Sequence, residues 1–119
     1  MAIKTKIIPL ANVAAADDAI VYLTVITGNA QIGGSLVKFS DESNDLIKGD
    51  VKNLKLGTGS DLRGRTLEVT TNVLDVNPGT NNIVITHRFE GATPREIVNS
   101  DSVDSDGDIF SFVTSYLFQ

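Results

Sequence analysis

The densest group of side chains able to do chemistry lies near the end of the chain, between Asp101 and Asp108. This segment contains four carboxylates within eight residues, which repel one another unless solvent or a cation separates them. Calcium prefers oxygen ligands supplied by alternating Asp residues. Asp104, Asp106 and Asp108 match the first three alternating positions of a calcium loop, so they are the candidate metal ligands.

The calcium interpretation has an alternative in a solvated turn. A calcium loop places Gly at its sixth position and a bidentate Glu further on, whereas here Ile109 takes the sixth place and no such Glu follows. Asp and Gly are also the residues that turns favour. The sequence therefore predicts no required cofactor. Calcium stays open for a module that binds lipid or glycan through the Asp101–Asp108 loop.

Catalytic chemistry has little support in the sequence. His87 is the only histidine and the chain has no cysteine, so a zinc site lacks ligands and a nucleophile paired with a base is unsupported. On a strand, His87 would share a face with Ile85 and Phe89, a spacing that points its ring inward. We expect a packed, hydrogen-bonded histidine in a protein that is not an enzyme.

The charge balance argues against a nucleic-acid partner. Fifteen acidic residues outnumber ten basic ones, giving a net charge of −5, and no basic cluster is present to contact phosphates. No apolar stretch approaches the length that spans a membrane, and the N-terminal segment lacks a signal-peptide core. We expect no membrane insertion and cytoplasmic synthesis without a Sec signal. Assembly into a particle or export by a dedicated machine stays open.

The elements that would position these residues are strands, and the clearest runs from Asp108 to Gln119. Side chains alternate faces along a strand, so Phe110, Phe112, Tyr116 and Phe118 share one face. These are four of the seven aromatic residues in the chain. Because aromatic side chains bury the most apolar surface, this face must lie in the core or against a partner.

The remaining strands are predicted from alternating or β-branched patterns between turn signals. They cover residues 3–10, 19–27, 31–39, 51–56, 67–76, 83–90 and 96–99. The Asn77-Pro78-Gly79 turn signal makes residues 66–90 read as a β-hairpin. No helix is expected. The sequence therefore predicts one all-β domain over residues 1–119, an antiparallel β-sandwich of about seven or eight strands and of immunoglobulin-like size.

Residues 1–10 are predicted to form an edge strand or an arm. Pro9 cannot donate to a β-ladder, and the lysines discourage pairing at an edge. Such a strand could pair with the sheet edge of a neighbouring subunit, whose acidic loops would suit the lysines; an ordinary first strand of the same domain is the alternative.

These observations predict a non-enzymatic structural or interaction module. The expected role is a self-assembling subunit of a tube, shell, filament or secreted particle. Its partners would be copies of itself or other protein subunits. The candidate interface residues are Ile3, Lys4, Lys6, Tyr116 and Phe118.

Overall fold

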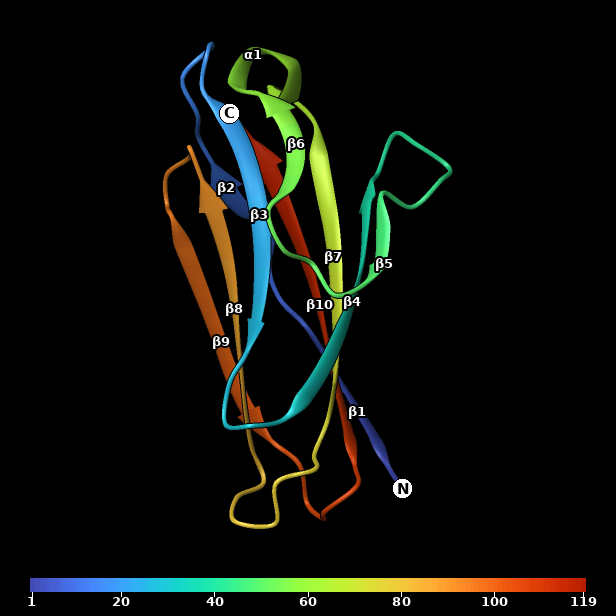
Figure 1. Cartoon of the computed structure of the whole chain (residues 1–119). Helices are drawn as coiled ribbons and strands as arrows, with labels where there is room; N and C mark the ends of the chain where they lie inside the picture. Colours follow the sequence, from blue (N-terminus) through green and yellow to red (C-terminus); the bar gives the residue numbers. More distant parts are fainter.

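The computed structural model describes residues 1–119 as a sandwich of two β-sheets (Figure 1). The strands are β1 (Ile3–Ile7), β2 (Ala11–Val13), β3 (Ile20–Thr27), β4 (Ile32–Phe39), β5 (Ile47–Gly49), β6 (Leu54–Thr58), β7 (Thr66–Leu74), β8 (Asn82–Glu90), β9 (Glu96–Ser102) and β10 (Ile109–Phe118). The larger sheet has the order β1-β10-β7-β4-β5, with β2 also paired to β10, and the smaller sheet has the order β6-β3-β8-β9. The predicted all-β sandwich is confirmed.

The structure adds three short elements to the predicted strands. β2 and β5 lie in the stretches between predicted strands, at residues 11–18 and 40–50. Each has three residues, too few for a face alternation to be recognised. A four-residue helix, α1 (Gly59–Leu62), replaces part of an expected turn and buries Leu62. No helix in the structure is long and apolar enough to cross a membrane.

The predicted hairpin over residues 66–90 is wrong. β7 pairs with β10 and β4 in the larger sheet, whereas β8 pairs with β3 and β9 in the smaller one. The turn signal at Asn77-Pro78-Gly79 marks a real reversal, but the link carries the chain from one sheet to the other. Gln31 holds that link, because its Oε1 accepts hydrogen bonds from the amides of Val76 at 2.7 Å and Asn77 at 2.9 Å.

The core lies between the sheets and is filled by alternate residues of three long strands, as their spacing predicts. None of these side chains is more than 2% exposed. They are Leu67, Val69, Thr71 and Val73 of β7, Ile83, Ile85, His87 and Phe89 of β8, and Phe110, Phe112, Tyr116 and Phe118 of β10.

β10 is the strand around which the larger sheet is built, since both of its edges are used. Along one edge it pairs antiparallel with β7. Along the other edge it pairs with β1 and then with β2, and both of these run parallel to it, which departs from the predicted antiparallel arrangement. Residues 8–10, with Pro9 in their middle, separate the two short strands.

Candidate interaction site at the first strand

β1 is the edge strand of the larger sheet, and it carries Lys4 and Lys6. Every one of its five residues is exposed to solvent. Ile3 is 65% exposed and Ile7 is 77% exposed, which is unusual for large apolar side chains. Of the residues next to the strand, Ile8 packs against the smaller of two core clusters. β1 therefore contributes backbone hydrogen bonds to the sheet, while its side chains stay exposed to solvent.

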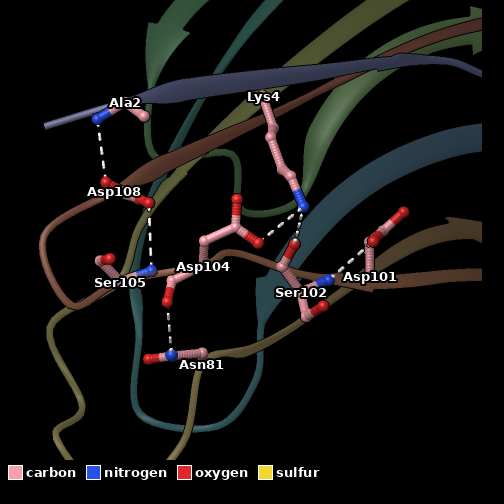
Figure 2. Close-up of polar contacts among 8 residues, drawn as sticks. All are labelled: Ala2, Lys4, Asn81, Asp101, Ser102, Asp104, Ser105 and Asp108. Atoms are coloured by element: carbon pink, nitrogen blue, oxygen red, sulfur yellow. Dashed lines mark hydrogen bonds and ion pairs between the residues drawn. The ribbon is translucent and has the colours of Figure 1, made fainter.

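The two lysines of β1 reach the acidic segment of the same chain, and Figure 2 shows the contacts of Lys4. Lys4 Nζ donates a hydrogen bond to the Ser102 carbonyl oxygen at 3.2 Å and lies 3.4 Å from Asp104 Oδ1. Lys6 Nζ lies 3.7 Å from Asp101 Oδ2. The sequence suggested that the lysines would meet acidic loops of a neighbour, and in the structure they meet those loops within one chain.

Asp108 anchors the beginning of the chain to the start of β10. Its Oδ1 accepts a hydrogen bond from the Ala2 amide at 2.9 Å, and its Oδ2 accepts one from the Ser105 amide at 3.1 Å (Figure 2). The Ile109 amide donates in return to the Ala2 carbonyl oxygen at 2.9 Å. These amide donors, first that of Ala2, hold the pKa of the Asp108 carboxyl below its usual range.

The three candidate metal ligands do not form a common site. No three His, Cys, Asp or Glu side chains in the structure are grouped as a metal would require. Asp104 and Asp106 are exposed on the loop, whereas Asp108 is buried with both carboxylate oxygens bonded to amides. The three carboxylates that match the calcium-loop positions therefore have different surroundings.

The side-chain amide of Asn81 lies within hydrogen-bonding distance of two carboxylates, those of Asp75 and Asp106. In the orientation drawn in Figure 2, Asn81 Nδ2 lies 3.4 Å from the Asp104 carbonyl oxygen, and the Asn81 oxygen faces only acceptors. With the amide turned over, Nδ2 donates to Asp75 Oδ2 at 2.7 Å and to Asp106 Oδ1 at 2.8 Å. Since ionised carboxylates only accept hydrogen bonds, the turned orientation is the one that satisfies them.

Sequence reasoning missed this polar cluster at the loop end of the sandwich. Asp75 is 1% exposed, and its Oδ1 accepts a hydrogen bond from Gln31 Nε2 at 2.7 Å. Gln31, Asp75 and Asn81 come from three separate segments, and each resembles ordinary turn chemistry by itself. The signal that would have identified them is their meeting in space, which no spacing along the chain encodes.

Tyr116 and Phe118, predicted as interface residues, lie in the core. They are 1% and 2% exposed, and both pack edge-on against Phe89, with ring centroids 4.9 Å and 6.0 Å apart. The sequence left this aromatic face either in the core or against a partner, and in the structure it lies in the core. Neither ring offers surface to a partner of the folded subunit, so the candidate interface is reduced to Ile3, Lys4 and Lys6.

His87 is packed and hydrogen-bonded, as its spacing predicts. Its Nδ1 lies 2.5 Å from the Tyr116 hydroxyl and its Nε2 lies 3.0 Å from Thr71 Oγ1, which is 2.9 Å from Ser35 Oγ. A neutral ring satisfies this chain if Tyr116 donates to Nδ1 and Nε2–H donates to Thr71. Burial lowers the pKa of His87 to about 4 and raises the pKa of Tyr116 to about 12.

A cleft on the surface between β3 and β4 does not include His87. It has a volume of about 300 Å³ and opens between β3 and β4, where Thr27, Gly33, Gly34 and Asp50 are among its lining residues. Gly33 keeps the two strands close, because a Cβ there would lie 2.2 Å from Thr27 Oγ1. Asp50 is the one titratable side chain in this lining, so the cleft lacks converging acid–base groups.

Comparisons with protein-family models, with curated proteins and with solved structures found no match. A functional assignment for this chain therefore rests on its geometry.

Proposed function

We propose that this protein is a non-enzymatic interaction module that assembles with copies of itself. The observation that carries the proposal is an apolar solvent-facing surface on the larger sheet, which continues without a break onto the open edge strand β1. The register of the sheet supports this surface, because residues directly opposite each other on paired strands share a face.

One row of this surface crosses four strands. Ile3 of β1 lies opposite Ile109 of β10, Ile109 lies opposite Leu74 of β7, and Leu74 lies opposite Ile32 of β4. Ile3 and Ile32, at the two ends, are 65% and 60% exposed, and the two residues between them are half-buried. Four large aliphatic side chains in one solvent-facing row are typical of a surface that another protein covers.

A second row lies four residues from the first on each strand. A strip of small and polar side chains lies between the two rows. The second row contains Ile7, which is 77% exposed, then Val113 and Thr70, and it ends at Leu36, which is 36% exposed. The intervening strip holds Thr5, Ser111, Asn72 and Gly34. No charged residue occurs in these three rows, and the charge beside them is Lys48 of β5, which lies opposite Leu36.

A second copy is the partner that suits this surface best. Beyond the rows, Lys38 of β4 lies opposite Glu68 of β7, so the charged border carries both signs. A two-fold contact places the same patch on both sides, and a border of both signs can then face itself favourably. Aligned sheets pack about 10 Å apart, a distance that interdigitated Ile and Leu side chains fill.

Light scattering on a sizing column tests the proposal. We expect the wild-type mass to be a multiple of 12.7 kDa and Ile32→Lys to shift the protein toward the monomer. Ile32 lies on β4, three strands from β1 in the sheet order. A change in mass on Ile32→Lys would therefore reflect contacts of the apolar face and not of the β1 edge. Val98→Lys is the matched control, since Val98 is a 58% exposed aliphatic residue on β9 of the smaller sheet.

Two outcomes contradict the proposal. A wild-type chain that stays monomeric up to high concentration would remove self-assembly. A chain that dissociates with Val98→Lys and not with Ile32→Lys would place the contact on the smaller sheet.

A further inference from the structure

The contacts of β1 point to a mode of assembly that the apolar surface alone does not specify. We propose that β1 is exchanged between copies, so that the first strand of one subunit lies on β10 of its neighbour in the place that its own β1 occupies here. This inference rests on the proposed self-assembly and adds the element that links the subunits.

The place that receives β1 is built by residues 101–113 of the chain. β10 offers five register positions, from Ile109 to Val113, and the Ile8 amide donates to the Val113 carbonyl oxygen at 2.9 Å. Asp108 takes the Ala2 amide, and the acidic segment takes the two lysines. None of these contacts depends on which copy supplies the strand, so an exchanged strand would keep all of them.

Little in the body of the subunit holds β1 in its own chain. All five of its residues are exposed, and no residue of the strand belongs to either core cluster. The ion pairs of Lys4 and Lys6 are exposed to solvent, so each adds little to what holds β1 in place. Releasing the strand would therefore expose backbone groups and the partly buried Ile8, and it would take no buried side chain of β1 out of the core.

The segment after β1 is suited to act as a hinge. β2 stays with its own chain, because Val13 is fully buried in the core and β2 pairs with the far end of β10. Residues 8–10 connect the two strands, and Pro9 has no amide to contribute to a ladder. A change of direction at residues 8–10 would carry β1 away while leaving β2 in place.

The charges of β1 and of the receiving loop suit a strand from another copy as well as the chain's own. β1 carries Lys4 and Lys6 and no acidic residue, whereas the receiving loop carries Asp101, Asp104, Asp106 and Asp108. Opposite charges steer a free strand toward this loop on another copy before any ladder forms. Reciprocal exchange between two copies would close a dimer, and one-way exchange would extend a chain of subunits.

Cysteine pairing tests the exchange directly, since the natural chain has no cysteine. Thr5 lies opposite Ser111 in the ladder. Paired strands are about 4.8 Å apart, which is within the range of Cα separations that a disulfide spans. Thr5→Cys protein mixed with Ser111→Cys protein and oxidised should give a covalent heterodimer on a non-reducing gel. We expect at least ten times less from Thr5→Cys mixed with Val98→Cys, the control.

A disulfide within one chain distinguishes strand exchange from self-assembly that leaves β1 in place. The double variant Thr5→Cys/Ser111→Cys, oxidised when dilute, fixes β1 on its own β10, and light scattering before and after reduction then compares locked and free strands. We expect the locked form to be monomeric and the reduced form to associate. Oligomers that survive the lock, or equal cross-linking in the control mixture, would overturn exchange and leave self-assembly standing. A monomeric wild type without cross-links would overturn both.

Discussion

Two of the strands that pair with β10, β7 and β1, hold it in opposite ways. β7 pairs along one edge over nine register positions, and its burial alternates so that every second side chain enters the core. β1 pairs along the other edge over five positions, and all of its side chains stay exposed. Both neighbours form a regular ladder, so the difference lies in the side chains and not in the backbone.

The comparison shows which part of strand pairing stabilises this fold. The positions of β1 that face the interior side of the sheet are Lys4 and Lys6, which lie opposite Phe110 and Phe112. Lysine cannot enter the core without a large desolvation cost, so both side chains extend to the acidic segment instead. Net backbone hydrogen bonding contributes about 1 kcal/mol per bond at most sites, whereas buried apolar side chains contribute more. β7 thus contributes buried side chains to the core, whereas β1 contributes none.

The sharpest way to break this comparison is a pair of matched truncations. Leu67→Ala on β7 removes a fully buried side chain and should lower the free energy of unfolding by about 2–5 kcal/mol. Ile3→Ala on β1 removes a side chain that is 65% exposed and should change it by about 0.5 kcal/mol or less. Urea denaturation of monomeric protein measures both. Equal losses would show that β1 carries core stability.

Acid should weaken the β7 side of β10 before it affects β1. His87 bonds to Tyr116 of β10 and Thr71 of β7, and its pKa of about 4 in the folded chain is below its ordinary value of 6.5. Between these values the unfolded chain binds more protons, so stability is full above pH 6.5 and falls as the pH drops toward 4. The loss should reach about 3 kcal/mol. Urea midpoints at pH 7.5, 5.5 and 4.5 measure it.

A control separates His87 from the carboxylates. His87→Gln does not titrate, so its stability should be nearly constant between pH 6.5 and 4, although lower overall. The lowered pKa of Asp108 acts in a different window, because its contribution is lost only as the pH falls below about 3.8. A variant that keeps the wild-type slope above pH 4 would show that the acid sensitivity has another source.

The inner faces of the long strands were predictable because burial imposes a period of two. Leu67 to Val73, Ile83 to Phe89 and Phe110 to Phe118 each alternate, and each is buried as the alternation predicts. The edge position of β1 was predictable for a similar local reason, since Pro9 and the lysines disfavour a central strand. Local chemistry therefore identified what each strand buries.

What local chemistry did not identify is which segments meet. A turn at Pro78 fits a hairpin and a sheet-to-sheet crossing equally well, because the turn sets the reversal and not the partner of the next strand. The alternation of Asp104, Asp106 and Asp108 matched the ligand positions of a calcium loop, and yet Lys4, Asn81 and Ala2 determine where each carboxylate goes. Those partners are distant in sequence, so their effect could not be predicted from the loop.

The smallest expected effect on stability comes from removing the lysines of β1. Lys4→Ala/Lys6→Ala removes both ion pairs with the acidic segment and should lower the free energy of unfolding by about 1 kcal/mol or less, because the pairs are exposed. The local effect should be clearer, since the Ile109 amide bonds to Ala2 and the Ile8 amide bonds to Val113 only while β1 is paired.

Hydrogen exchange at those two amides measures how often β1 leaves its place. We expect exchange about five times faster in the double variant, and wild-type exchange that quickens with added salt, because salt screens exposed pairs. Lys48→Ala/Lys52→Ala is the control, as neither lysine has an ion pair in the structure, and it should leave both rates unchanged. Exchange indifferent to Lys4, Lys6 and salt would mean that the ladder and Asp108 alone hold β1, and that charge does not control its release.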